Sequence, residues 1–364
     1  MSLPVAIINI NYLKSNLDYL KSISDGSELY PVIKANAYGH GFNEIAQELD
    51  KILIKGVCIA TVNELQTLVN LKVNYSILHM GKIVFSKLSL YESNNVIATI
   101  NSMSDLQKIS KTYKGIKKIR VHIKIDTGMS RMGASLEKFD EIFQKCLIMD
   151  NVILEGIYTH LANSDNNSAE LNQIQIKLFD KIVSRIKKKK NIKFHILNSG
   201  GLFNYSNYKY DLIRTGIAMY GVSPLGIHNK NLKPVMEFKA PLILKKNIKK
   251  GTMVGYGNSY KAKNDMKIAI IQCGYGDGVP FEFSNKGFVY YNSLEIPIIG
   301  RVSMDLICID ISNINIKNNE YVTLWGSILN EKSRLEYVSG FFDKIPYVYL
   351  TGITNRVKKI YVYD

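Results

Sequence analysis

The chain has 364 residues, more than one hydrophobic core usually serves, so we expect two domains. Hydrophobic residues make up 46% of the sequence and charged residues 21%, a balance typical of globular proteins and not of disordered or fibrous ones. No apolar stretch approaches the roughly 20 residues that a membrane-spanning helix needs, so no membrane partner is expected.

The formal net charge of +16 raises the question of a nucleic-acid partner. Most of the excess comes from lysine, in short runs at residues 187–190 and 245–250 that are typical of solvated helix ends and turns. Isoleucine, asparagine and tyrosine are also abundant, so the charge follows a compositional bias and not a binding stripe. The sequence favours a protein without a nucleic-acid partner, although a basic nucleic-acid binder stays open as a different class.

The N-terminal segment and the cysteines bear on the compartment. Residues 1–10, MSLPVAIINI, lack a basic n-region and a small-residue cleavage site, so we interpret them as a strand and expect a cytoplasmic protein. The cysteines stand singly in apolar runs without CxxC spacing, which predicts small buried side chains in a reducing compartment and no metal site. They are Cys58, Cys146, Cys273 and Cys308.

Up to about residue 222, short β-branched or aliphatic runs alternate with stretches whose apolar residues recur every three or four positions. The runs predict eight strands, at residues 29–35, 56–61, 76–81, 96–101, 119–126, 154–162, 194–200 and 212–221. The stretches between them predict helices, the clearest at residues 42–52, 62–70, 103–110, 135–148 and 171–188. Eight βα units are the number that closes a (β/α)8 TIM-type barrel, although a doubly wound open sheet would show a similar alternation.

The positions of the polar residues help to separate these two folds. Active sites of barrels lie at the carboxyl ends of the strands, so polar side chains should cluster there. Ionisable and amide groups do fall at or just after the predicted strand ends, namely Lys34, Tyr38, Asp126, Arg131, His160, Asn198, Ser199 and Arg214. Ordinary surface loops would scatter such groups, so the sequence favours the barrel.

From about residue 233 the pattern changes to strand-like runs separated by turn residues, with one helix expected near residues 334–345. We therefore predict an α/β protein in which the barrel is followed by a mostly β C-terminal domain. The barrel is placed at residues 8–228, and residues 1–7 together with 229–364 are assigned to the β-rich domain.

Two loops and one lysine are candidates for a phosphate-binding site with a reactive amine. Barrel enzymes frequently hold a phosphate with the loops after the seventh and eighth strands, which here are residues 197–201 and 214–221. Ser199 offers a hydroxyl, and the glycines allow backbone N–H groups to approach an anion. Lys34 would reach the same mouth and could hold pyridoxal 5′-phosphate as a Schiff base. From the residues alone, ordinary turn glycines and a lysine whose stem lies along apolar neighbours remain alternatives.

The segment VIKANAYGHG at residues 32–41 resembles the cofactor-lysine motif of the bacterial alanine racemases. Further motifs of that family follow in the family's order: KIDTGMSRMG (124–133), YTHLANSD (158–165), FHILNSGG (194–201), RTGIAMYG (214–221), VGYGNSY (254–260), CGYGDG (273–278), GRVSMD (300–305) and IPYVYLTGITNRV (345–357). The resemblance covers nearly the whole chain. It implies a pyridoxal-phosphate-dependent isomerase that interconverts L-alanine and D-alanine and supplies D-alanine for peptidoglycan.

The resemblance also implies catalytic roles. Lys34 would carry the cofactor and serve as one base, and Tyr256 would serve as the other on the opposite face of the substrate Cα. A tyrosine has an ordinary pKa of about 10 and needs help to act as a base, which the family pattern gives through His160 and Arg214. Arg214 would face the pyridine nitrogen, where a permanently charged guanidinium disfavours protonation, and His195 would orient Arg214.

The other matched residues surround the cofactor and the substrate. The phosphate pocket that the resemblance implies contains Tyr38, Asn198, Ser199, Gly216, Ile217 and Tyr347. Arg131 would bind the cofactor's phenolic oxygen and the substrate carboxylate, assisted by the backbone N–H of Met304. Lys124 matches a position that is carbamylated in some members of the family, and Tyr275 and Asp305 match residues at the substrate entrance.

In this family the tyrosine of the β-rich domain serves the barrel of a partner subunit, so the resemblance implies a homodimer with shared sites. Tyr256, Tyr275, Met304 and Asp305 would then act in trans. The chain departs from the usual pattern after CGYGDG, where VPFEF follows, and at the end, where NRVKK stands in place of RVPR. These departures concern the entrance and the domain edge, so a racemase of broader or different specificity, for example for serine, stays an alternative.

Two further classes are less favoured. A decarboxylase on the same barrel would have a carboxylate at the pyridine nitrogen and a cysteine general acid, and the residues Arg214 and Tyr256 argue against it. A non-catalytic cofactor-binding protein built on a lone barrel would lack the β-rich domain and its tyrosine motifs. No spacing of His, Cys or Asp predicts a set of metal ligands.

Overall fold

The computed structural model describes residues 3–93, 95–186, 192–208 and 210–364. The lysine run at 187–190 and the end of the helix predicted at 171–188 lie outside these residues. By its internal contacts the chain divides into two units. The barrel unit comprises Leu17–Ala37 and Phe42–Met219, and the β unit comprises Met1–Asn16, Tyr38–Gly41 and Tyr220–Asp364. The domain boundaries at residues 8 and 228 stay predictions.

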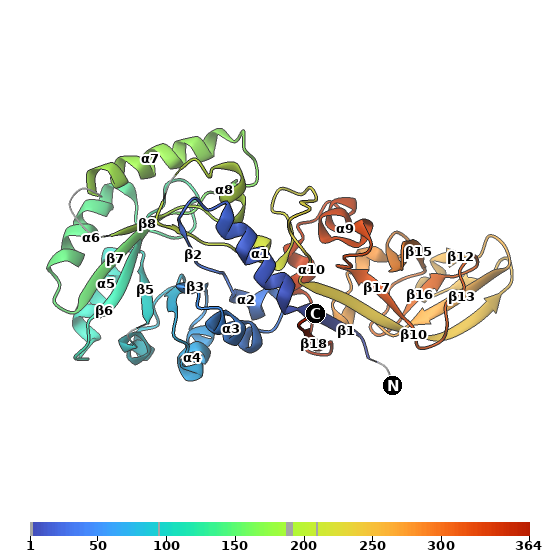
Figure 1. Ribbon diagram of the computed structural model, residues 1–364. Coiled ribbons are helices and arrows are strands. Elements are labelled where there is room, and N and C mark those ends of the chain that lie inside the picture. The colour runs from blue at the N-terminus through green and yellow to red at the C-terminus, as the bar shows by residue number, and fades with distance from the viewer. Residues whose placement is uncertain (1–2, 94, 187–191, 209) are drawn as a thin grey trace. The chain divides into compact units, whose positions relative to one another are not determined.

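Short parallel strands form the wall of the barrel unit (Figure 1). One continuous sheet contains, in chain order, β3 (Gly56–Ile59), β4 (Ser76–His79), β5 (Val96–Ile100), β6 (Ile119–Lys124), β7 (Val152–Tyr158) and β8 (Lys193–His195). The remaining pair, β2 (Glu28–Leu29) and β9 (Leu212–Ile213), is also parallel. Isolated parallel bridges join Val32 to Cys58 and Asn198 to Arg214, so β2 and β9 close the ring of eight strands. The predicted (β/α)8 barrel is confirmed.

The wall is apolar because both of its faces are covered. Strands β3 and β5 are buried at every position. The helices that follow the strands are amphipathic, as in α6, whose buried residues Phe139, Ile142, Phe143 and Cys146 recur at intervals of three and four. The helical elements of this part are α1 (Ile10–Ser22), α3 (Phe42–Lys51), α4 (Val62–Leu71), η1 (Phe85–Glu92), α5 (Met103–Thr112), α6 (Leu136–Ile148), α7 (Glu170–Ile186), α8 (Ser199–Asn204) and η2 (Ile217–Tyr220).

An eight-stranded, mostly antiparallel sheet is the frame of the β unit, with the order β13-β16-β15-β14-β17-β10-β1-β18 (Figure 1). Its strands are β1 (Val5–Asn9), β10 (Met236–Ile248), β13 (Met266–Ile271), β14 (Phe288–Tyr291), β15 (Leu294–Ile299), β16 (Ile307–Asp310), β17 (Tyr321–Trp325) and β18 (Lys358–Val362). A hairpin of β11 (Met253–Val254) and β12 (Tyr260–Lys261) and the helices α9 (Leu335–Phe341) and α10 (Tyr347–Thr351) are added to it. The predicted mostly β C-terminal domain is confirmed.

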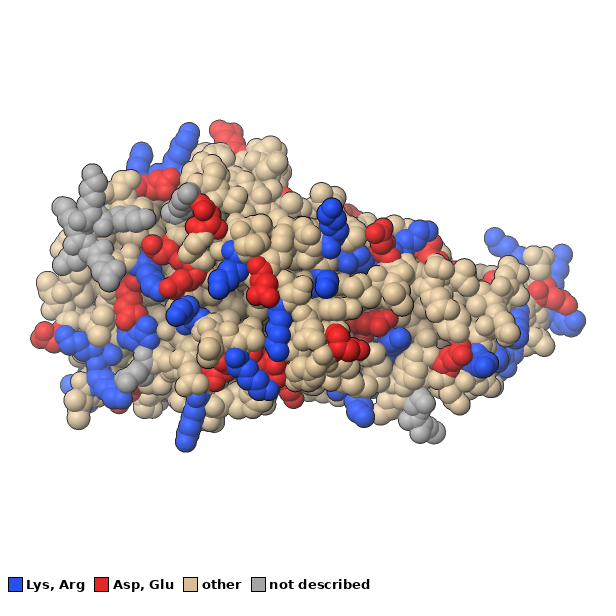
Figure 2. Space-filling view, viewed as in Figure 1, with Lys and Arg blue, Asp and Glu red and all other residues tan. Residues whose placement is uncertain are grey.

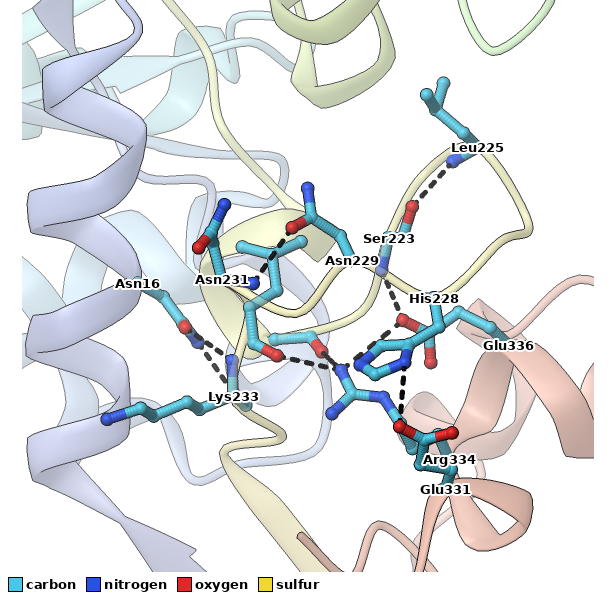
Figure 3. A network of polar contacts seen from close by, with 12 residues as sticks. Asn16, Ser223, Leu225, His228, Asn229, Asn231, Lys233, Glu331, Arg334 and Glu336 are labelled. Carbon is cyan, nitrogen blue, oxygen red and sulfur yellow. Dashed lines mark hydrogen bonds and ion pairs between the residues drawn. The ribbon is translucent and has the colours of Figure 1, made fainter.

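Buried polar contacts fix the segment that leads into β10 (Figure 3). Nη2 of Arg334 donates to the carbonyls of Gly221 and Leu232 at 3.1 and 2.8 Å. The Glu336 carboxylate accepts from the N–H of Ser223 at 2.8 Å and lies 3.6 Å from the Arg334 guanidinium. Because Arg334 and Glu336 are both buried, their charges are tolerated only as long as these partners are present.

The molecular surface carries both signs of charge. On the face that Figure 2 shows, Lys and Arg side chains are interspersed with Asp and Glu among the coloured residues, without a basic stripe on that face. Within the described part of the chain, no helix combines the length and apolarity that crossing a bilayer requires. Three of the cysteines, Cys58, Cys146 and Cys273, are buried as predicted, and Cys308 is half-buried.

Candidate active site

Lys34 stands where the first strand of the barrel ends. The N–H of Ile33 still donates to the carbonyl of Cys58 at 3.0 Å. From Ala35 to Tyr38 the backbone then has φ values of 51° to 56°, which is a left-handed helical turn. The strand predicted over residues 29–35 is therefore wrong from Lys34 onward, because the chain leaves the barrel wall there in a left-handed turn. The residues of this turn include no glycine, the residue that would have indicated a positive φ.

A carboxylate holds this left-handed turn in place. Such a conformation costs about 1–2 kcal/mol for each non-glycine residue, so it persists only where other contacts determine it. Glu64 Oε1 accepts from the N–H of Ala35 at 2.8 Å, and Oε2 accepts from the N–H groups of Ala60 and Thr61 at 2.8 and 2.9 Å. The same side chain completes the capping box of α4. Glu64 thus ties the turn after Lys34 to a helix of the barrel.

The Lys34 amine is half-buried at the end of this strand. Burial lowers the pKa of Lys34, and the positive charge of Arg131 lowers it further, while Glu64 acts in the opposite direction. A lowered pKa increases the fraction of neutral amine, the form of lysine that attacks a carbonyl carbon. The environment of Lys34 therefore favours covalent chemistry.

Arg214, at the end of β9, is buried among polar atoms of the barrel unit. Nη1 contacts Nδ1 of His195 at 2.5 Å, and Nη2 donates to the carbonyls of Thr159 and Ile196 at 2.8 and 3.0 Å. The guanidinium carbon lies 5.1 Å from the centroid of the Tyr158 ring. Its charge is thus stabilised by carbonyl dipoles, imidazole nitrogen and an aromatic face.

The contacts of Arg214 determine the tautomers of two histidines. A guanidinium only donates, so Nδ1 of His195 accepts and the ring proton lies on Nε2, which donates to Nδ1 of His122 at 3.0 Å. In the same way Nη2 of Arg214 lies 3.3 Å from Nδ1 of His160 and places that ring's proton on Nε2. Burial first, and the charge of Arg214 second, lower the pKa of His160 and His195 well below the usual value. Both rings are neutral at neutral pH.

Lys124 and Arg131 bring two further cations to this end of the barrel. Lys124 is the last residue of β6, and burial together with neighbouring positive charges lowers its pKa to about 8. Arg131 is exposed in the following loop. Asp126 shapes that loop, because its Oδ1 accepts the N–H groups of residues 128, 129 and 130 at 2.9 to 3.1 Å. The charge of Arg131 acts on both Lys34 and Lys124.

Ser199 joins the loops that follow β8 and β9. Its hydroxyl oxygen accepts from the N–H of Gly216 at 2.9 Å and from that of Ala218 at 3.4 Å. Asn198 is the N-cap of α8, with its Oδ1 accepting from the N–H three residues on at 2.9 Å. Ile217 lies between the two donors and is fully buried. The two loops expected to hold a phosphate therefore do meet, at Ser199.

The other predicted site residues lie in the β unit. The Tyr38 ring is 5.0 Å from the ring of Tyr220 and 5.9 Å from that of Tyr347. Tyr256 is 72% exposed and stands on a tight turn of β-unit backbone. One surface pocket of this unit is lined by Tyr256, Tyr275, Phe281, Arg301, Val302, Ser303, Met304, Asp305 and Leu306. The structure thus collects all four residues that were predicted to act in trans at one surface pocket.

An ion pair fixes Asp305 at this pocket. Nη2 of Arg356 donates to Oδ1 of Asp305, and Nε of Arg356 lies 3.1 Å from Oδ1 of Asp277. Asp277 is buried and also accepts the N–H of Gly274 at 3.0 Å. Because Arg356 lies in the NRVKK segment, the part of the sequence that departs from the resembled pattern still orders the predicted entrance.

Comparison with known proteins agrees over both units. The family model described as the alanine racemase N-terminal domain matches residues 8–224, and the model of the alanine racemase C-terminal domain matches residues 235–361. The chain belongs to the alanine racemase family.

Named relatives cover nearly the entire chain. It is 34% identical over 371 residues to the alanine racemase of Coxiella burnetii, with 99% of each chain covered, and 34% identical over 355 residues to that of Vesicomyosocius okutanii, with 97% covered. A solved structure of alanine racemase from Bartonella henselae with covalently bound pyridoxal phosphate is similar with a TM-score of 0.89. That protein is 31% identical, and the match covers 100% of both chains. Alanine racemases are isomerases.

His122 was not among the site residues that the sequence predicted for this member of the alanine racemase family. His122 is buried in β6 and extends the chain of contacts from Arg214 through His195. Gly156 in β7 makes room for it, because a Cβ at that position would come within 2.6 Å of Nε2 of His122. The pairing of β6 with β7 also shifts register just before His122. A glycine inside a predicted strand was the available sign of this close approach.

The predicted residues of this alanine racemase family member fall into two groups. Within the barrel unit lie Lys34, Lys124, Arg131, His160, His195, Asn198, Ser199, Arg214, Gly216 and Ile217. Within the β unit lie Tyr38, Tyr256, Tyr275, Met304, Asp305 and Tyr347. Over the described ranges, no group of three His, Cys, Asp or Glu side chains is arranged to hold a metal ion.

Proposed function

We propose that this chain is a pyridoxal-phosphate-dependent alanine racemase that interconverts L-alanine and D-alanine with two bases, Lys34 and Tyr256. The observation that supports this most is the surroundings of Lys34, a half-buried amine of lowered pKa at the barrel mouth, where Arg131 and Lys124 add positive charge. Anionic groups of a cofactor and of an amino acid would be stabilised there.

The donor set suits pyridoxal 5′-phosphate. The N–H groups of Gly216 and Ala218 donate to the Ser199 hydroxyl oxygen, which leaves the hydroxyl proton to be donated to a phosphate where the two loops meet. Lys34 would hold the cofactor covalently. Arg214, whose guanidinium contacts an imidazole nitrogen and two carbonyl oxygens, would face the pyridine nitrogen. We also assign Asn198, Ile217, Tyr38 and Tyr347 to the phosphate end. When bound, the cofactor supplies an electron sink that makes the substrate Cα–H acidic.

Two bases are needed because racemisation removes a proton from one face of Cα and returns one to the other. In the proposed reaction, Nζ of Lys34 and the phenolic oxygen of Tyr256 each accept or donate a proton on their own face. The neutral His160 ring carries its proton on Nε2 and would donate it in a hydrogen bond to the phenolate of Tyr256. That contact would stabilise the charged form of tyrosine, while Arg214 orients His160.

Binding of the substrate is assigned to residues of both units. Arg131 would hold the substrate carboxylate, and the backbone N–H of Met304 would assist. Lys124 would position Arg131, and carbamylation of its amine, which the lowered pKa favours, would add an anion for that purpose. Tyr275 and Asp305, which line the pocket that also contains Tyr256, would define the entrance.

We further propose that the protein is a cytoplasmic homodimer that supplies D-alanine for peptidoglycan. The proposal of shared sites is supported by the exposure of the β-unit pocket, where Tyr256, Met304 and Phe281 are 72%, 51% and 54% exposed. Aromatic and Met side chains of that kind are typical of surfaces that a second subunit covers.

An absorption spectrum followed by polarimetry tests the function. Purified protein mixed with pyridoxal phosphate should gain a visible-range band that Lys34→Ala lacks, and it should abolish the optical rotation of L-alanine with time. Tyr256→Phe should keep the band and lose racemisation by about 100-fold or more. L-Serine run in parallel separates an alanine enzyme from one of broader specificity. Persistence of the optical rotation in the presence of bound cofactor would exclude the proposed activity.

A further inference from the structure

Helix α7 buries two amides where an amphipathic helix normally buries hydrocarbon. Its later turns present Ile176, Phe179, Ile182 and Ile186 to the interior, but Asn172 and Gln175 in its first turns are completely buried as well. An amide buried without hydrogen-bond partners costs about 1–3 kcal/mol, so its partners indicate why it is there.

Gln175 contacts the segment that follows β7 on both sides of Leu161. Its Oε1 accepts from the N–H of Ala162 at 2.9 Å, and its Nε2 donates to the carbonyl of His160 at 2.9 Å. One side-chain amide thus pairs with two peptide groups in the manner of a neighbouring strand. The backbone position of His160 is thereby fixed from the helix side.

The same amide reaches the loop after β6. Nε2 of Gln175 lies 3.3 Å from the Thr127 hydroxyl, which in turn contacts the hydroxyl of Thr159 at 2.9 Å. Thr127 directly follows Asp126, the residue that shapes the loop carrying Arg131. Gln175 therefore connects the loop of Arg131 with the loop of His160.

From the barrel side, the His160 segment is held by Arg214. Nη2 of Arg214 donates to the carbonyl of Thr159 at 2.8 Å and contacts Nδ1 of His160 at 3.3 Å. Together with Gln175, Arg214 thus gives the carbonyls of Thr159 and His160 and the N–H of Ala162 fixed side-chain partners. A small rotation of this segment would move the His160 ring away from Arg214.

We propose that Gln175 is a positioning residue for the reaction, which orients His160 and Arg131 by clamping the loops that carry them. This inference rests on the proposed function. Gln175 does not itself touch substrate or cofactor. Loss of its amide should misplace His160 relative to the second base, and misplacement of that kind reduces rates by about 10- to 100-fold.

Two substitutions of the full-length holoenzyme test the clamp, with alanine as substrate. Gln175→Leu removes all three contacts of the amide and should lower kcat about 10-fold or more while changing KM for alanine less. Gln175→Glu keeps the shape of the side chain. Its carboxyl, when protonated, can accept from Ala162 and donate to His160, but when ionised it can only accept.

The pH dependence of Gln175→Glu distinguishes positioning from packing. Burial raises the pKa of a carboxyl, so the loss relative to wild type should be small at low pH and grow as the pH rises. The fractional loss of kcat in Gln175→Leu should be the same at each pH. The titrations of His160, Lys34 and their neighbours affect wild type and variant alike, so they cancel in the ratio of the two kcat values. If kcat of Gln175→Glu is like that of wild type, and the ratio of the two kcat values does not change with pH, the proposal is overturned.

Hydrogen exchange gives a readout independent of activity. In the cofactor-free protein, Gln175→Leu should speed amide exchange in residues 159–163, because Ala162 loses its acceptor. Gln173→Leu on the same helix is the matched control and should leave exchange and kcat unchanged, because Gln173 accepts from the Tyr208 hydroxyl at 3.2 Å, outside the loops that Gln175 connects. If wild type does not racemise alanine, the proposed function fails, whereas unchanged exchange in Gln175→Leu would refute the clamp itself. Should Gln175→Leu not fold, the pH dependence of kcat in the isosteric Gln175→Glu decides the proposal.

Discussion

At the scale of single residues, the site is dominated by cations and neutral histidines in a desolvated environment. Lys34, Lys124 and Arg214 lie at the same end of the barrel, and burial lowers the pKa of each. Keeping such charges close together costs folding free energy. In the proposed function, an anionic cofactor and substrate would bind at this place and offset the repulsion among the cations.

Lys124 allows this cost to be measured. Its pKa is lowered from an ordinary 10.5 to about 8, so below pH 8 the folded protein carries an ammonium group that it disfavours. Lys124→Met should therefore raise the free energy of unfolding by up to about 3 kcal/mol at pH 7. Between pH 8 and about 10, Lys124 is protonated in the unfolded wild-type chain but largely neutral in the folded one. The free energy of unfolding of wild type therefore rises with pH in this range, and the advantage of the variant should shrink.

Urea unfolding at several pH values, in buffer freed of carbon dioxide, checks this prediction. Lys177→Met, at an exposed position of α7, is the control and should differ little from wild type at any pH. An advantage of Lys124→Met that stays constant from pH 7 to about 10 would contradict the assigned titration.

At the scale of elements, the left-handed turn after Lys34 is the least ordinary feature of the barrel. Ala35 and Ala37 adopt a left-handed conformation that alanine disfavours, and Glu64 stabilises it through the N–H of Ala35. The turn sets the direction in which the chain leaves β2, and so the place of the Lys34 amine. Backbone strain at a proposed catalytic lysine is consistent with selection for position over stability.

Glycine substitutions should therefore act with opposite signs in this turn and in a normal helix. Ala35→Gly removes the Cβ that disfavours the left-handed turn and should stabilise the protein by up to about 1 kcal/mol, net of the extra entropy of glycine in the unfolded chain. Ser110→Gly, exposed in the right-handed α5, should destabilise it by about 0.5–1 kcal/mol. Thermal unfolding of both variants beside wild type measures the difference, and equal losses in the two would speak against strain at Ala35.

Most elements could be predicted from the sequence because their signals are local. The five helices expected from apolar spacing begin and end within two residues of the observed ones wherever the structure describes them. Asn198 and Ser199 fell at a strand end, where a barrel needs polar groups. The turn at Lys34–Tyr38 could not be predicted because alanine gives no sign of a left-handed backbone, and a single asparagine, Asn36, is too common elsewhere to indicate one. Gln175 and His122 were missed because their partners, His160 and His195, are distant in sequence.

At the scale of the whole molecule, the proposed site needs residues from both units, and the second base is proposed to come from a partner subunit. Within the β unit, Tyr256, Tyr275, Met304 and Asp305 share one exposed pocket. Within the barrel unit, the proposed cofactor residues are linked by hydrogen bonds that do not involve those four. A composite site of this kind makes activity depend on association.

Mixing two inactive chains tests the shared site. Lys34→Ala lacks one base and Tyr256→Phe lacks the other, so each homodimer should be inactive. After co-refolding or subunit exchange in equal amounts, half of the dimers would be mixed and would carry one intact site, giving about a quarter of wild-type activity. Lys34→Ala mixed with itself is the control. No recovery in a mixture shown by sedimentation to contain mixed dimers would refute the contribution in trans.

The place of β1 in its sheet has a consequence for synthesis on the ribosome. β1 (Val5–Asn9) pairs with β10 and β18, which begin at Met236 and Lys358, so it is translated long before either neighbour. Throughout translation of the barrel, this apolar strand has two open edges, and one edge stays open until β18 emerges. The β unit can therefore be completed only after nearly all of the chain is made. The nascent chain is most exposed to aggregation through this strand while its barrel is being translated.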